Sequence, residues 1–229
     1  MCYSNLSMES YYSGFTNLDI SVFLPDRIET NTIVYVHCMK EEGENIFSLL
    51  NKKVPLIVIS GNDWEKDFSP FKHSKVFHGG HDFQGGADDY LEVLTKKIIP
   101  TIEKKIPFLI QKRIIAGYSL AGLLAFYSIY KTDLFDSVAC VSGSLWYPGM
   151  MEYIKKEEPI RIPNKIYFSL GDKESETKNP FLSKAYDCMK ETADLFNIKG
   201  SKTFFELNKG GHFIDSDKRT AKAISWLLS

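Results

Sequence analysis

Hydrophobic positions along the chain gather in short runs separated by polar or Gly- and Pro-containing segments. Five of these runs are almost continuously apolar, a pattern typical of strands that are covered on both faces of a parallel sheet. They are Thr32–His37, Leu56–Ser60, Arg113–Gly117, Ser137–Ser142 and Lys165–Leu170. Two further β-rich runs cover Leu18–Leu24 and Lys202–Leu207. The first of these two alternates between apolar and polar residues, which predicts an edge or antiparallel strand.

Helical periodicity appears between the predicted strands. The predicted helices are Asp88–Lys105, Leu120–Tyr130, Asn179–Phe196 and Lys218–Leu228. Strands that alternate with helices predict an α/β fold with a mostly parallel central sheet and helices on both faces. The chain of 229 residues has no internal repeat and no linker-like run, so a single domain over residues 1–229 is expected.

A turn with a serine at its apex connects one predicted strand to the next helix. The sequence RIIAGYSLAG, residues 113–122, runs from an apolar strand through Ser119 directly into an apolar helix. This context is that of a nucleophile elbow, whose sharp turn needs small residues two positions before and after the nucleophile. Gly117 meets this need, whereas Ala121 replaces the usual Gly and departs from the pattern by one methyl group.

The elbow predicts where an oxyanion would be stabilised. The backbone N–H of Leu120, at the start of the helix, points toward the position where negative charge develops during acyl transfer. A second donor is expected from the loop after Thr32–His37, where the backbone N–H groups of Cys38 and Met39 are the candidates. The chance reading, an ordinary turn before a core helix, is disfavoured by the partners that follow later in the chain.

A serine hydroxyl needs a base, and the order of residues in this fold places that base last. His212 follows the final predicted strand in the loop NKGGHF, where two glycines allow the chain to fold back. The acid should follow the preceding strand, and both Asp172 and Glu174 lie there. Glu174 is favoured because it lies further into the loop, while Asp172 could instead stabilise a turn. A Ser119–His212 dyad without an acid is the third alternative.

Composition and charge exclude several other classes of protein. Lys and Arg number 28 and Asp and Glu number 29, so no basic excess indicates a nucleic-acid partner. The amino terminus lacks a signal-peptide pattern and no apolar run is long enough for a membrane span, so a cytoplasmic location without membrane contact is expected. The spacing of His78, His81 and Asp82 matches no common metal site, and neither a metal nor another cofactor is expected. The four cysteines are expected to be reduced, and none lies in a context that favours a thiol nucleophile.

With these motifs, the chain resembles the esterase family of α/β-hydrolases that includes esterase D, feruloyl esterases and siderophore esterases. The resemblance is strongest in IIAGYSLAGLLAFYSIYKTDLFDSVACVSGSLWY and extends through GGAD, KIYFSLGDKESETKNP and GGHF. It implies an α/β-hydrolase fold with little or no cap domain, with Ser119 and His212 in the catalytic roles. It also implies an open site shaped by residues 61–86 and 144–158. Tyr118, His37, Trp64 and Trp146 are candidate substrate-binding residues, although core packing is an equally good explanation for each.

The function expected from these observations is cleavage of a carboxylic ester by a Ser–His–acid mechanism. A siderophore-type or aryl ester is one candidate substrate. The expected partner is therefore a small-molecule ester, and the protein is expected to be a monomer or a homodimer. The same residues would serve an acyltransferase or a thioesterase, because the fold does not choose among these reactions. A different class, a catalytically weak or inactive relative that binds a ligand, remains if Ala121 distorts the elbow.

Overall fold

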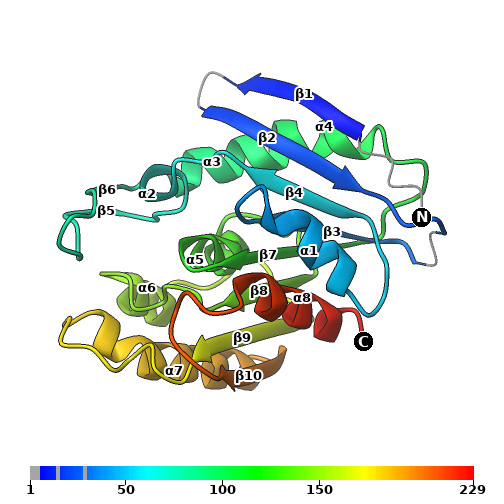
Figure 1. Cartoon of the computed structure of the whole chain (residues 1–229). Coiled ribbons are helices and arrows are strands. Elements are labelled where there is room, and N and C mark those ends of the chain that lie inside the picture. The colour runs from blue at the N-terminus through cyan, green and yellow to red at the C-terminus, as the bar shows by residue number, and fades with distance from the viewer. Residues whose placement is uncertain (1–5, 14–15, 28–29) are drawn as a thin grey trace.

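The computed structural model describes residues 6–13, 16–27 and 30–229, and its centre is an eight-stranded sheet (Figure 1). The strand order is β1-β2-β4-β3-β7-β8-β9-β10. The bounds are β1 Leu6–Ser13, β2 Thr16–Phe23, β3 Thr32–His37, β4 Leu56–Ser60, β7 Lys112–Tyr118, β8 Ser137–Val141, β9 Lys165–Gly171 and β10 Lys202–Asn208. In this order the six strands from β4 to β10 are parallel to one another, while β2 is antiparallel to both β1 and β4. All seven predicted strands are confirmed, and the mostly parallel sheet agrees with the predicted α/β-hydrolase fold.

Helices cover both faces of this sheet. One face packs against α1 (Glu42–Leu49) and α8 (Ser216–Leu227), whose buried residues join a core with Val34, Val36 and Ala116. The helices of the other face contribute to a larger core; they are α3 (Ala87–Val93), the π-helical turn η1 (Leu94–Ile98), α4 (Ile99–Glu103), α5 (Leu120–Tyr127), α6 (Met150–Lys156) and α7 (Ala185–Ile198). Alternate residues of β3, β4, β7, β8 and β9 therefore enter different cores, as the two-residue period of a strand requires.

The predicted helix Asn179–Phe196 begins later than expected. The side chain of Asn179 accepts hydrogen bonds from the N–H groups of Phe181 and Leu182, and it donates to the carbonyl of Val76. These bonds fix a turn and a short 3-10 helix, η3 (Leu182–Lys184), so that α7 starts only at Ala185. The predicted start at Asn179 was wrong, because the asparagine side chain competes for the backbone N–H groups.

The segment between Gly61 and Gly86 is more ordered than a simple loop. It contains α2 (Trp64–Asp67), which Asp63 caps, and a small antiparallel pair, β5 (Lys72–His73) and β6 (Phe83–Gln84). The segment lies near the carboxyl ends of the parallel strands (Figure 1). In open α/β sheets ligands bind at this edge, so the candidate site is sought here.

None of the helices formed by the described residues combines the length and the apolar character that crossing a bilayer requires.

Candidate active site

Ser119 stands at a tight turn between β7 and α5. Its backbone has φ 60° and ψ −123°, a conformation that a residue with a side chain rarely adopts and that costs about 1–3 kcal/mol. Three backbone hydrogen bonds hold it: Ser119 N–H donates to Val141 O at 3.0 Å, and Ser119 O accepts from Leu123 at 3.0 Å and Ser144 at 3.1 Å. The strain is thus maintained by β8, by the start of α5 and by the segment after β8, and it presents the hydroxyl at the sheet edge.

The glycines of the elbow are required by close backbone contacts. A Cβ atom on Gly117 would lie 2.2 Å from the carbonyl oxygen of Ala121, and one on Gly122 would lie 2.9 Å from the carbonyl oxygen of Gly117. Ala121 itself is fully buried within α5, and its methyl group is accommodated. The departure at Ala121 therefore leaves the elbow intact, because the steric restriction falls on positions 117 and 122.

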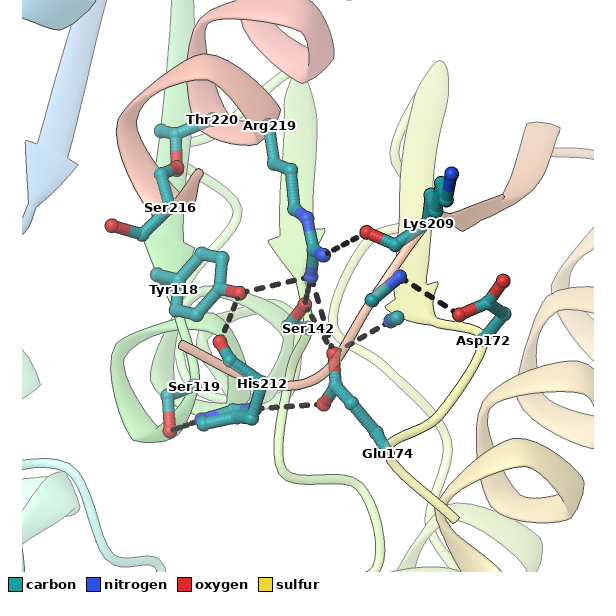
Figure 2. Close-up of polar contacts among 12 residues, drawn as sticks. Tyr118, Ser119, Ser142, Asp172, Glu174, Lys209, His212, Ser216, Arg219 and Thr220 are labelled. Atoms are coloured by element: carbon teal, nitrogen blue, oxygen red, sulfur yellow. Dashed lines mark hydrogen bonds and ion pairs between the residues drawn. The ribbon is translucent and has the colours of Figure 1, made fainter. Parts of the chain in front are cut away.

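His212 and Glu174 complete a chain of hydrogen bonds that begins at Ser119 (Figure 2). The Nε2 atom of His212 lies 2.9 Å from Ser119 Oγ, and its Nδ1 atom lies 2.7 Å from Glu174 Oε2. With the proton on Nδ1, the imidazole donates to the carboxylate and Nε2 is left to accept the serine proton. The loops after β9 and β10, together with the elbow, bring these three residues together as the sequence analysis expected for this choice of acid.

Glu174 and Asp172 have different roles in the loop after β9. The side chain of Glu174 is only 6% exposed, and its Oε1 atom accepts hydrogen bonds from the N–H of Gly171 at 2.6 Å and from Ser142 Oγ at 2.9 Å. Asp172 is exposed and points away from His212 (Figure 2), and its Oδ1 atom accepts the N–H of Gly210 at 2.8 Å. Asp172 thereby supports the loop that carries the histidine, and it does not reach the imidazole.

Two residues of this network, Ser142 and Arg219, were missed by the sequence analysis. Ser142 directly follows β8 and has a positive φ of 44°, which directs its hydroxyl to Glu174. Arg219 is 4% exposed and lies 3.4 Å from Glu174 Oε1. A signal for Arg219 existed, because it falls on the buried face of α8 with Ala223 and Ile224, where a charge needs a partner.

The three candidate oxyanion donors, Leu120, Cys38 and Met39, differ in the hydrogen bonds that their N–H groups make. Its N–H belongs to the first turn of α5, where backbone N–H groups have no partner within the helix. Met39 follows β3, whose register pairs His37 with Gly117, so the loop after β3 reaches the same edge as Ser119. The N–H of Met39, however, donates to Glu42 Oε2 at 3.0 Å, and the N–H of Cys38 donates to Ile59 O at 3.4 Å.

Two of the candidate substrate-binding residues, Tyr118 and His37, are buried, as the core-packing alternative for each of them requires. Tyr118 is 7% exposed and belongs to the core beneath α8, because strand alternation turns it away from the face that carries α5. Its hydroxyl donates to the carbonyl of His212 at 2.5 Å. His37 has no exposed surface, and its Nε2 atom lies 2.7 Å from the hydroxyl of Tyr90. Burial lowers the pKa of His37 to about 3, so its imidazole is neutral.

Other aromatic and apolar residues are better placed to contact a substrate. Trp146 is partly buried, lies two residues beyond the Ser144 N–H that bonds to Ser119, and contacts Phe77 with ring centroids 5.7 Å apart. Phe213, which follows His212, is 92% exposed. Trp64 begins α2 and packs against Phe68. Trp146 and Trp64 remain candidate wall residues.

Three cysteines, Cys38, Cys140 and Cys188, are buried and carry free thiols, while Cys2 lies outside the described residues. Burial raises the pKa of each of the three thiols, which makes them poor nucleophiles. Over residues 6–13, 16–27 and 30–229, His, Cys, Asp and Glu side chains form no group of three or more that could hold a metal ion.

Several solved structures share this fold. An IroE-like serine hydrolase from Shewanella oneidensis superimposes with a TM-score of 0.76 at 19% identity, covering 92% of this chain and 75% of that one. The siderophore hydrolase EstA from Aspergillus nidulans gives a TM-score of 0.71 at 17% identity, covering 92% and 89% of the two chains. The enterobactin hydrolase IroE in complex with DFP gives 0.69 at 16% identity, covering 99% and 93%. At these identities the likeness establishes the α/β-hydrolase fold.

A comparison with curated protein sequences found no significant match. The family model described as "Putative esterase" matches residues 45–215, which is most of the chain and includes Ser119, Glu174 and His212. With the elbow intact and the fold of the esterases in place, the chain belongs to this esterase family.

Proposed function

We propose that this protein is a serine carboxylesterase in which Ser119 is the nucleophile, His212 the general base and Glu174 the acid. The observation that carries the proposal is the continuous hydrogen-bonded chain from Ser119 Oγ through His212 to Glu174, at distances of 2.9 and 2.7 Å. Membership of an esterase family supports the same class of reaction.

In the acylation step, Ser119 Oγ attacks the ester carbonyl carbon while His212 Nε2 takes the hydroxyl proton. The negative charge that develops on the carbonyl oxygen is stabilised by the N–H of Leu120. When the tetrahedral intermediate collapses, the bond from carbon to the alkoxy oxygen breaks, and the proton on His212 passes to the departing alcohol. Glu174 holds the imidazole in the required tautomer and stabilises its protonated form.

Deacylation uses the same residues with water as the nucleophile. His212 takes a proton from water, the hydroxide attacks the acyl-enzyme, and the proton returns to Ser119 as the carboxylic acid leaves. We assign the second oxyanion donor to Met39, whose N–H would exchange its bond to Glu42 Oε2 for a bond to the oxyanion, while Ser216 Oγ donates to the other oxygen of that half-buried carboxylate. The histidine is partly exposed, so water reaches the acyl-enzyme without a lid movement.

The surroundings of the site favour an ester with an apolar or aromatic part. Phe213 is exposed and contacts the ring of His212, Met39 is exposed in the loop after β3, and Trp146 lies two residues after Ser144, whose N–H donates to Ser119 O. Burial of such side chains against a substrate is favourable at about 25 cal/mol per Å² of apolar surface. Siderophore and feruloyl esters, which give several structural neighbours their names, belong in a first substrate screen.

The test is hydrolysis of p-nitrophenyl acetate and butyrate by the wild-type protein and by Ser119→Ala. We expect turnover by the wild type and a loss of at least about a thousandfold in kcat for the variant, because the acyl-enzyme cannot form. A fluorophosphonate probe should label the wild type and not the variant. A wild-type protein that neither turns over these esters nor reacts with the probe would contradict the proposal and favour a ligand-binding relative.

A further inference from the structure

Arg219 is a buried cation directly behind the proposed acid. It lies in the first turns of α8, on the face that also buries Thr220, Ala223 and Ile224, and its side chain is 4% exposed. A guanidinium group cannot lose its proton at ordinary pH, and a buried charge is unfavourable unless it is paired. The position of Arg219 on the buried face of α8 therefore calls for an explanation beyond packing.

The guanidinium contacts groups from four other segments of the chain (Figure 2). One terminal nitrogen lies 3.4 Å from Glu174 Oε1, 3.4 Å from Ser142 Oγ and 3.2 Å from the hydroxyl of Tyr118. The other terminal nitrogen donates to the carbonyl of Lys209 at 3.0 Å. These groups follow or end β7, β8, β9 and β10, so Arg219 links the carboxyl ends of four parallel strands.

The two oxygens of Glu174 face different partners. Oε2 faces the imidazole of His212, whereas Oε1 faces the guanidinium of Arg219 as well as the Gly171 N–H and the Ser142 hydroxyl. Rotation of the carboxylate away from His212 would break the contacts on both sides. The contacts at Oε1 therefore fix the orientation of the oxygen that holds the imidazole.

A second route joins Arg219 to the histidine through the loop that carries it. Arg219 fixes the carbonyl of Lys209 directly, and the Tyr118 hydroxyl that it contacts donates to the carbonyl of His212. Between these two anchored carbonyls lie Gly210, which has a φ of 103°, and Gly211. Glycines give a loop many conformations, so anchoring both ends restricts the positions available to the imidazole.

We propose that Arg219 is a positioning residue of the active site, which holds the Glu174 carboxylate in its orientation and anchors the loop that carries His212. The proposal rests on the proposed function. It assigns a role to a buried residue that acts through Glu174 and the loop without touching the substrate.

The charged and titratable groups around Arg219 determine how the loss of its positive charge would affect activity. Arg219 faces Glu174 from the β9 loop, Tyr118 from β7 and, further away, Tyr167 on β9. Burial raises the pKa of both tyrosines, so they are neutral, and Tyr167 donates to Glu206, which pairs with Lys222. Arg219 is thus the cation that balances Glu174. Without it, the carboxylate of Glu174 would lose a fixed positive charge 3.4 Å away, and we expect the acidic limb of the pH–rate profile to move to higher pH.

The experiment compares the pH dependence of kcat/KM for wild type, Arg219→Met and Arg219→Lys with p-nitrophenyl butyrate. We expect the acidic limb of Arg219→Met to move to higher pH by about one unit, which is about a tenfold loss on that limb. Arg219→Lys keeps the charge and should keep the acidic limb near that of the wild type, with a lower kcat from poorer orientation. Arg113→Met, which removes a partly buried arginine paired with Glu103 away from the site, is the matched control and should leave the profile unchanged.

If Arg219→Met does not fold, Arg219→Gln, which can still bond to Lys209 and Tyr118, should show the same shift because it lacks the charge. A profile with the wild-type shape, merely reduced at every pH, would overturn the proposal and leave Arg219 a structural residue. NMR titration of the His212 ring protons, assigned with His212→Gln, provides a readout that does not depend on turnover. If wild type hydrolyses no ester, the proposed function fails, and the direction of change in the NMR midpoint still decides the role of Arg219.

Discussion

Two carboxylates that lie two residues apart differ in role because of what surrounds them. Glu174 is enclosed by N–H and O–H donors and faces His212, whereas Asp172 is exposed and supports Gly210. The longer Glu side chain and the turn in which Glu174 N–H donates to Gly171 O let the carboxylate fold back over the strand end. Burial and reach thus select Glu174, rather than Asp172, as the carboxylate that meets His212.

Replacing these two carboxylates separately should affect kcat to very different extents. We expect Glu174→Gln to lower kcat by about 10²–10⁴-fold, because an amide cannot stabilise the protonated imidazole and favours the wrong tautomer. Asp172→Asn keeps an oxygen that can accept the Gly210 N–H, so its kcat should stay close to that of the wild type. Steady-state kinetics on p-nitrophenyl esters measures both. Equal losses in the two variants would contradict the assignment of Glu174.

At the scale of elements, the elbow depends on how closely β7 approaches the first turn of α5. A Cβ atom on Gly117 would lie 2.2 Å from a backbone oxygen, and that oxygen has no means of moving aside without breaking the turn. The fully buried Ala121 lies in the helix itself, where a methyl group adds packing and favours helical structure. The two small residues of the motif therefore act for different physical reasons.

The elbow can be tested with a pair of substitutions of one methyl group each. Gly117→Ala should abolish measurable esterase activity and destabilise the fold, since the added Cβ atom collides with the Ala121 carbonyl. Ala121→Gly should retain activity and lose about 1 kcal/mol in the free energy of unfolding, because glycine is a poorer helix former. Urea unfolding and ester hydrolysis report the two effects. An active, stable Gly117→Ala protein would refute this account of the turn.

At the scale of the whole molecule, His37 couples the central sheet to the helices that cover it. It ends β3, contacts Phe68 and Tyr90 edge-to-face, and has no exposed surface. Burial lowers its pKa from 6.5 to about 3, because the charged form would be removed from water. The unfolded chain binds a proton at this residue below about pH 6.5 and the folded protein does not, so its contribution to stability is present above pH 6.5 and is lost progressively as the pH falls toward 3.

The free energy of unfolding should therefore fall on acidification in a way that depends on His37. Between pH 7.5 and pH 5 we expect this residue to account for a decrease of about 2 kcal/mol, which His37→Phe should remove even though its absolute stability is lower. Urea unfolding at both pH values measures the difference, and His81→Phe, at an exposed histidine, is the control that should retain the decrease. A pH dependence that is identical in His37→Phe and wild type would contradict this expectation.

The regular parts of the fold were predictable because the strands are short, apolar and separated by turn residues. β3 and β4 have the bounds that their hydrophobic runs indicated, since both are buried on two faces. β1 was not predicted, and the start of α7 was displaced by the Asn179 turn. At the start of α7 the hydrogen bonds of the Asn179 side chain determine the backbone conformation, and the spacing of hydrophobic residues does not reveal these bonds.

The sequence by itself determined the α/β-hydrolase fold, the elbow at Ser119 and the order of serine, acid and histidine, because local patterns encode strands, turns and helices. The choice of Glu174 over Asp172, the burial of Tyr118 and His37, and the place of Arg219 were decided only by tertiary structure. Each depends on which groups from other strands and helices lie within hydrogen-bond distance, and on how much water they exclude. Residues 118, 142, 174 and 209 end or follow four different strands, and the sheet brings them to one edge, where Arg219 of α8 meets them.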